Sequence, residues 1–273
     1  EIFRLMAQQW SVMETLSPQD FLAFRDALGS ASGFESAQMR ELEILIGLQD
    51  NQRNGGMDPL KRFVQMAETS EQGKVDLDRL RARMDEISLW DTARNWLGRT
   101  PIDGSTPDSE NDTEVVQSYV EAHIAALEQH GSDMAERMSE WGMGDSDAMK
   151  ARFAAVAKGA RDFLMPNGEV DRPRAGLLFI ESHRDLPLLA WPRTLIDRMI
   201  ELEESMVKWR HSHARMVERI IGRRIGTGGS SGVDYLDATT TYRVFTDLWA
   251  VRTILVKSEL RPQIRDPEFY GFA

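Results

Sequence analysis

A predicted amphipathic helix in the last third of the chain carries two histidines, of which only one shares its apolar face. His213 lies four residues after Trp209 and three before Met216, so these side chains recur at helical spacing. His211 lies about 200° around the helix axis, on a more polar flank with Arg210. An inward imidazole is either a core residue bonded to a carbonyl, or a metal ligand or acid–base group, and the spacing leaves both interpretations open.

A glycine-rich run follows this helix. From Gly226 to Gly232 the sequence reads GTGGSSG, with Thr227 as its first hydroxyl residue. Such a loop can turn its N–H groups and hydroxyls toward a small polar ligand, but the same composition is typical of a flexible surface linker. The glycine spacing misses GxGxxG and no Gly-Lys-Ser/Thr follows, so the run matches neither phosphate-binding motif.

An arginine near the N-terminus is a second candidate for binding. Arg25 follows Phe21 by four residues, so the two share a helix face. An arginine beside an aromatic ring usually forms a surface ion pair above a packed stem. The alternative is a guanidinium that accepts a carboxylate ligand at the edge of an aromatic pocket.

The elements that must position these residues are all predicted to be helices. Ser17 and Pro18 form a strong helix start signal, and His123 and His130 are expected on the solvated face of a polar helix. Residues 101–112, rich in proline, glycine, serine and acids, are predicted to be mobile. The expected helices lie near residues 1–16, 18–28, 35–48, 59–67, 76–97, within 113–163 as a pair, 209–221 and 235–259, with a short helix or strand at 175–180. No two-residue alternation is sustained, so we predict an all-α fold in which long helices form a bundle.

Composition excludes several classes of function. The 273 residues carry a net charge of −11, which argues against nucleic acid or an anionic membrane as a partner. No run of about eighteen apolar residues predicts a membrane span. Because the sequence contains no cysteine, disulfides, thiolate metal sites and covalent haem attachment are excluded. A cytoplasmic location is expected.

Two stretches of the chain resemble the tryptophan 2,3-dioxygenase family. Residues 8–47 read QQWSVMETLSPQDFLAFRDALGSASGFESAQMRELEILIG. Residues 209–236 read WRHSHARMVERIIGRRIGTGGSSGVDYL, and TYRVFTDLW follows. The two stretches occur in the family's order and cover about a third of the chain. Residues 51–192 match weakly and are expected to contain a helical insert within one domain spanning 1–273.

The resemblance implies a role for each matching residue. His213 falls on the proximal ligand of a haem b iron (iron protoporphyrin IX). The remaining haem-binding positions fall on Arg40, Trp209 and Tyr235. The substrate-binding positions fall on Phe21, Arg25, Ser32 and Thr227. The family's distal histidine lies in a segment upstream of Glu1, so no catalytic residue is assigned here, and we expect an N-terminal part that this sequence does not contain.

The resemblance also implies a reaction. The expected function is a haem-dependent oxygenase that cleaves the indole C2–C3 bond of L-tryptophan with O₂ to give N-formylkynurenine, working as a homotetramer. Two alternatives stay open: a haem monooxygenase acting on a substituted tryptophan or another aromatic amino acid, and a non-catalytic homologue that binds haem or a ligand.

Overall fold

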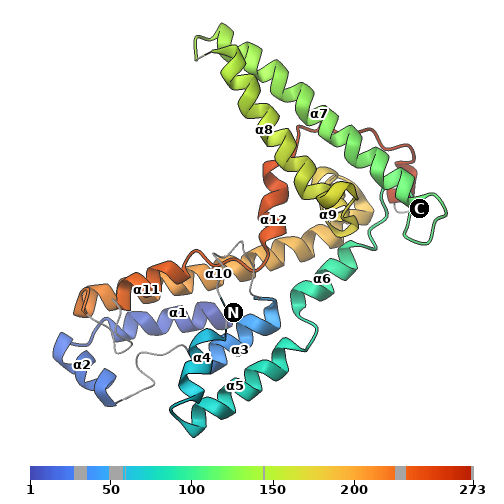
Figure 1. The fold of residues 1–273 in the computed structure, drawn as a ribbon. Coiled ribbons are helices and arrows are strands. Elements are labelled where there is room, and N and C mark those ends of the chain that lie inside the picture. Colours follow the sequence, from blue (N-terminus) through green and yellow to red (C-terminus); the bar gives the residue numbers. More distant parts are fainter. Residues whose placement is uncertain (28–35, 49–57, 59, 144, 225–231, 272–273) are drawn as a thin grey trace. The chain divides into compact units, whose positions relative to one another are not determined.

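The computed structural model describes residues 1–27, 36–48, 58, 60–143, 145–224 and 232–271. Within these ranges every regular element is a helix, apart from an isolated bridge between Ile102 and Ser105, which confirms the all-α prediction (Figure 1). None of the helices in these ranges is long and apolar enough to cross a membrane.

The chain folds as two compact units. The first unit comprises residues 1–91 and 199–245, and the second comprises residues 92–198 and 246–273. Two helices, α6 (Leu89–Leu97) and α10 (Ala190–Ile221), contribute residues to both units. Each unit is described by itself, and the single domain expected over residues 1–273 stays a prediction.

Serine caps begin several helices of the first unit. The remaining helices of this unit are α1 (Ile2–Met13), α2 (Pro18–Ala27), α3 (Ala37–Ile46), α4 (Lys61–Ala67), α5 (Glu71–Met84) and α11 (Gly232–Thr239). The Ser17 hydroxyl accepts a 3.1 Å hydrogen bond from the Asp20 N–H, which satisfies an amide in the first turn of α2. The predicted start signal at Ser17 and Pro18 is therefore confirmed. Ser36 and Ser70 cap α3 and α5 in the same way.

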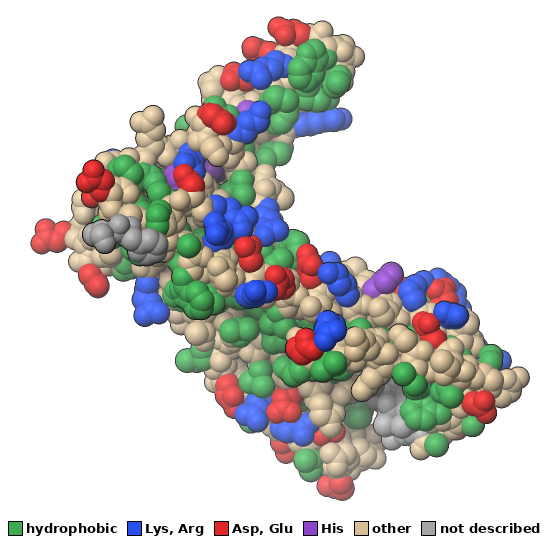
Figure 2. All heavy atoms as spheres, turned by 180° about the vertical axis from the view of Figure 1, so that it is seen from behind, with side chains coloured by type: hydrophobic (Ala, Val, Ile, Leu, Met, Phe, Trp, Pro, Cys, Tyr) green, Lys and Arg blue, Asp and Glu red, His purple; other side chains and the backbone are tan. Residues whose placement is uncertain are grey.

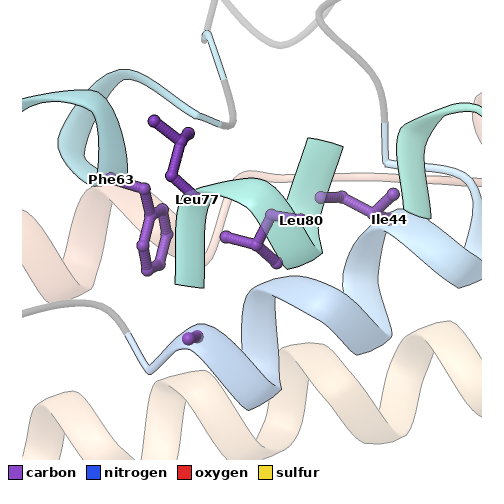
Figure 3. Close-up of a cluster of buried hydrophobic side chains, with 5 residues drawn as sticks. Ile44, Phe63, Leu77 and Leu80 are labelled. Atoms are coloured by element: carbon purple, nitrogen blue, oxygen red, sulfur yellow. The ribbon is translucent and has the colours of Figure 1, made fainter. Parts of the chain in front are cut away.

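The helices α3, α4 and α5 enclose one apolar core of the first unit. Figure 3 shows Ile44, Phe63, Leu77 and Leu80 pointing toward one another from these helices. Phe63 and Leu80 are completely buried. Burial of each such side chain stabilises the fold by roughly 1.5–3 kcal/mol, so this cluster fixes α3 against its two neighbours.

A helical hairpin forms much of the second unit. Helices α7 (Asp112–Glu140) and α8 (Ser146–Leu164) run side by side in opposite directions, as the sequence predicted for residues 113–163 (Figure 1). A Cβ atom at Gly131 would lie 2.6 Å from the Cβ of Phe153, so the close approach of the two helices requires glycine there. Residues 175–180 are helical and lie within α9 (Arg172–Ser182), of which residues 175–181 are buried.

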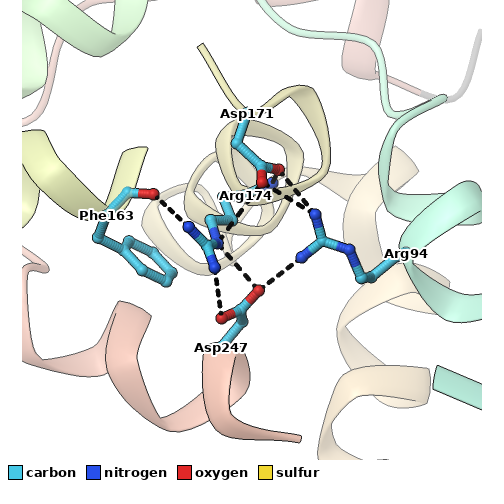
Figure 4. Close-up of polar contacts among 5 residues, drawn as sticks. All are labelled: Arg94, Phe163, Asp171, Arg174 and Asp247. Carbon is cyan, nitrogen blue, oxygen red and sulfur yellow. Dashed lines mark hydrogen bonds and ion pairs between the residues drawn. The ribbon is translucent and has the colours of Figure 1, made fainter. Parts of the chain in front are cut away.

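A network of charged side chains, of which Asp247 is buried and the others are partly buried, joins three helices of the second unit (Figure 4). Asp247, in the first turn of α12 (Thr246–Ala250), accepts hydrogen bonds from Arg94 at 2.7 Å and from Arg174 at 3.0 and 3.2 Å. Arg94 also donates to Asp171 at 2.9 Å. The Asp171 carboxylate in turn caps α9 by accepting from the Arg174 N–H at 3.1 Å. The two carboxylates and two guanidinium groups neutralise one another where α6, α9 and α12 meet.

Exposed ion pairs are spread over the surface. Figure 2 shows acidic and basic side chains interspersed on the face in view. Lys158 and Asp162, with 75% and 63% of their side chains exposed, form one such pair at 2.6 Å. Pairs this exposed contribute roughly 0–1 kcal/mol each, so the buried network has far more influence on stability.

The segment predicted to be mobile has a fixed conformation instead. Ile102 and Ser105 exchange two backbone hydrogen bonds of 2.9 Å around a turn. The Tyr270 hydroxyl accepts from the Gly104 N–H at 3.0 Å and donates to the Pro101 carbonyl at 3.1 Å. The prediction was wrong because Tyr270, far along the chain and completely buried, satisfies the backbone of a segment whose own composition favours disorder.

His123 was also predicted wrongly, as a surface residue. It is completely buried in α7, and its Nε2 lies 2.8 Å from the carbonyl oxygen of Ile254. His183, at the end of α9, is also buried, with its Nε2 3.1 Å from the Tyr119 hydroxyl. Burial lowers the pKa of both histidines, that of His183 from 6.5 to about 4.

These lowered pKa values predict that stability falls in mild acid. Between pH 6.5 and about pH 4, His183 is protonated in the unfolded chain and neutral in the folded chain. The free energy of unfolding should therefore fall by about 2 kcal/mol from this residue between pH 7 and pH 5. Urea unfolding at the two pH values measures the loss, and His183→Asn should reduce it. The same loss in the variant would contradict the assignment to His183.

Candidate functional site

The imidazole of His213 lies among aromatic rings contributed by α1 and α10. Its ring is stacked on that of Trp10, with 4.5 Å between ring centroids and 7° between planes. Trp209 makes tilted contacts with both rings, at centroid distances of 5.9 Å. His211 is exposed, so the predicted difference between the two histidines is confirmed.

The surroundings keep His213 uncharged. Burial lowers the pKa of its imidazole to about 4, so the ring is neutral at neutral pH. The ring makes no hydrogen bond within the part of the chain that the structure describes. A neutral imidazole with a free lone pair is the form of histidine that ligates metals.

An apolar cluster beside these rings joins α1, α2 and α10. Phe21, Met216 and Ile220 are buried at its centre. Trp10 and Val217 pack against them. Phe21, a predicted substrate-binding residue, therefore packs against the same helix that carries His213, about one turn further along it.

Arg25 lies one turn beyond Phe21 on α2 and is partly exposed. It forms no ion pair or hydrogen bond with any residue in the described ranges. The sequence left two interpretations of Arg25 open, and among the described residues the surface ion pair is not observed.

Arg40 lies in a buried ion-pair network. Arg40 forms an ion pair with Glu43 at 3.0 Å, and the other carboxylate oxygen of Glu43 accepts a hydrogen bond from Arg210 of α10. All three side chains are about 95% buried. The expectation that Arg210 lies on a wetter flank was therefore wrong, because Glu43, 167 positions away, neutralises the guanidinium inside the protein.

The other predicted site residues lie further along the chain or outside the described ranges. Tyr235 is half-buried on α11, which an ion pair between Arg215 and Asp237 ties to α10. Ser32 and Thr227, with most of the glycine-rich run, lie outside the residues that the structure describes. The structure thus brings together Phe21, Trp209 and His213, with Arg25 close to Phe21 in sequence.

Trp10 is the member of the site that sequence reasoning missed. Its spacing in α1 marks it as an inward residue, but nothing in the sequence pairs it with His213. The indole Nε1 atoms of Trp10 and Trp209 are buried and have no acceptor among the described residues. The site therefore offers a neutral imidazole, aromatic faces and two unsatisfied N–H donors.

The fold and this site define the class: an all-α protein with a ligand-competent histidine held among aromatic side chains. Comparison with known proteins identifies the family. The family model described as tryptophan 2,3-dioxygenase matches residues 1–255, a range that includes the weakly matched residues 51–192. The chain belongs to the tryptophan 2,3-dioxygenase family, as the resemblance predicted.

Several relatives support this assignment. A tryptophan 2,3-dioxygenase-like protein of Xanthomonas campestris pv. campestris (strain 8004) is 44% identical over 276 residues, which cover 94% of this chain and 98% of the relative. Tryptophan 2,3-dioxygenase 2 of Ralstonia nicotianae is 40% identical over 100% of this chain and 76% of its own length. Tryptophan 2,3-dioxygenase of Sorangium cellulosum is 40% identical over 99% of this chain and 68% of its own length. The relatives named as dioxygenases are enzymes, so the predicted enzyme class is confirmed at the level of the family.

Proposed function

We propose that this chain is a haem-dependent dioxygenase that cleaves the indole C2–C3 bond of L-tryptophan with O₂ and releases N-formylkynurenine. The observation that carries the proposal is the imidazole of His213, which is stacked on Trp10, is neutral, and has no hydrogen-bond partner among the described residues. The family membership and the names of the relatives support the reaction class.

The residues around His213 fit haem b. His213 would hold the haem iron through a ring nitrogen, and Trp209 would offer an apolar wall to the macrocycle. The indole N–H groups of Trp10 and Trp209, which have no acceptor among the described residues, would suit the carboxylate side groups of the macrocycle. Arg40 is the proposed neighbour of a propionate, and Tyr235 a further wall. When bound, haem supplies the iron chemistry that activates dioxygen.

The chain's own residues bind and orient the amino acid. Arg25 is proposed to take the carboxylate through two parallel hydrogen bonds, and Thr227 with the glycine-rich run the ammonium group. Phe21 offers an apolar wall to the indole, and Ser32 a hydroxyl at the edge of the site. Binding the substrate at three points fixes the C2–C3 bond in one orientation and excludes water from it.

Replacing Arg25 with alanine should weaken L-tryptophan binding by about 2–5 kcal/mol, because the substrate carboxylate loses a charged partner. Calorimetric titration of the haem-loaded protein measures the change. Arg219→Ala is the matched control, since Arg219 is 70% exposed and pairs with Glu14. An affinity within twofold of wild type in Arg25→Ala would contradict the carboxylate-binding role.

The reaction is tested with the full chain, loaded with haem, reduced, and given L-tryptophan and ¹⁸O₂. Mass spectrometry of the product should find two labelled oxygen atoms. One labelled oxygen, or product from a substituted tryptophan only, would replace the proposal with a monooxygenase. Tight haem and tryptophan binding without any product would support the non-catalytic homologue.

Assembly and location are proposed on the family resemblance. We propose a homotetramer in the cytoplasm, a compartment whose reducing conditions suit a chain without cysteine. Sedimentation equilibrium tests the assembly: a mass four times that of the chain supports it, and a stable monomer or dimer contradicts it.

A further inference from the structure

We propose that Trp10 is a positioning residue for His213: the stacked indole fixes the plane in which the imidazole presents its nitrogen to a metal. This inference rests on the proposed ligation of haem by His213. It assigns to α1 a part in the site that the sequence patterns do not indicate.

The imidazole plane needs support from outside its own side chain. Rotation about the bond that joins the ring to Cβ is soft and roughly two-fold, so the backbone of α10 does not fix the plane. Metal-ligating histidines usually donate their second ring N–H to a carboxylate, a carbonyl or a water, which sets the orientation. Within the described ranges no protein group makes such a bond to His213.

The stack supplies the missing constraint. A 4.5 Å centroid distance with 7° between planes places the two rings in parallel, offset stacking contact, so rotation of the imidazole out of this plane reduces that contact. Trp10 itself is held from two sides, by the tilted ring of Trp209 at 5.9 Å and by the cluster around Phe21 and Met216. The indole is therefore a rigid support.

The stack also favours the ligated state of the imidazole. Coordination to a cation draws electron density from the ring and makes it more positive. The face of an indole carries negative charge density and attracts such a ring more strongly than a neutral one. Trp10 should therefore strengthen the bond between His213 and iron as well as orient it.

The first test uses the full chain without haem, with histidine labelled by ¹³C and ¹⁵N. The ring protons of His213, assigned by their absence in His213→Ala, should be shifted upfield by the ring current of Trp10. Trp10→Leu should abolish the shift, and Trp10→Phe should keep much of it. Trp141→Leu, which removes a tryptophan that is 62% exposed, should leave the spectrum of His213 unchanged.

The second test uses the haem-loaded protein. In Trp10→Leu the iron–histidine stretching band of the ferrous protein, measured by resonance Raman spectroscopy, should broaden and shift to lower frequency. The rate of haem transfer to apomyoglobin should rise about three- to tenfold, the factor expected for one aromatic stack. Trp10→Phe should restore most of both values, and it serves as the folded variant if Trp10→Leu is unstable.

The outcomes separate this inference from the function on which it rests. If Trp10→Leu and Trp10→Phe leave both the iron–histidine band and the rate of haem loss at their wild-type values, the positioning role alone is overturned. If wild-type protein shows no iron–histidine band, the proposed ligation fails, and the inference fails with it.

Discussion

His213→Ala should yield a protein that retains no haem after desalting, whereas His211→Ala should retain the wild-type amount. His213 offers the neutral imidazole that a haem iron requires, and no other described histidine lies in its aromatic cluster. Without the His213 imidazole the haem would lose the protein ligand proposed to hold its iron, and apolar contacts alone would not replace that ligand. Haem content per chain, measured as the pyridine haemochrome, gives the result.

The two histidines form a matched pair, since they lie two residues apart on the same helix. His211 is exposed, so its replacement changes the length and polarity of a side chain on α10 without changing the site. Equal haem content in the two variants would refute the assignment of His213. Added imidazole should restore haem binding to His213→Ala if the ring alone is missing.

Asp247→Ala should lower the free energy of unfolding by about 3 kcal/mol, the largest stability effect we expect from a single side chain. The carboxylate is 4% exposed and accepts hydrogen bonds from Arg94 and Arg174 (Figure 4). Its removal leaves the guanidinium groups of Arg94 and Arg174 with Asp171 as their one shared carboxylate in this network. Because Arg94 is 29% exposed, water offsets part of the cost, which places the effect at the lower end of the range for broken buried ion pairs.

Urea unfolding followed by circular dichroism measures this loss. Asp162→Ala is the control, because it removes a carboxylate that is 63% exposed and should cost less than about 0.5 kcal/mol. The loss of unfolding free energy in Asp247→Asn should lie between the losses in these two variants, since asparagine keeps the size of the side chain and lacks its charge. If Asp247→Ala were as stable as the control, the network would be a minor contributor to the second unit.

Local patterns were sufficient to predict most of the helices. The start of α2 at Pro18 follows from Ser17 and Pro18 alone, because a cap depends on neighbours within one turn. The contrast between His213 and His211 follows from helical period in the same way. These properties depend on residues three or four positions apart, which a sequence displays directly.

Properties set by distant partners could not be predicted. His123 looked like a surface residue because its sequence neighbours are polar, yet the carbonyl of Ile254, 131 positions away, satisfies it in the core. The segment 101–112 looked mobile because Tyr270 is remote in sequence. A buried polar group is tolerated wherever a partner exists, and the sequence does not reveal that partner.

In the candidate site, too, local features could be predicted and contacts between distant residues could not. Phe21 and His213 could be proposed from spacing and resemblance, and the structure places them on packed helices. The stack of Trp10 on His213 joins α1 to α10, and nothing in the sequence of either helix indicates this contact. Ser32 and Thr227 lie outside the described residues, so their roles stay predictions.

The ion pair between Glu43 and Arg210 has a consequence for how this sequence can change over generations. Replacing Glu43 alone by an apolar residue would remove the carboxylate that Arg40 and Arg210 share in the protein interior. A lineage that loses Glu43 must therefore also change these guanidinium groups or acquire a new acidic partner for them. Positions 43 and 210, 167 residues apart, are therefore expected to change together.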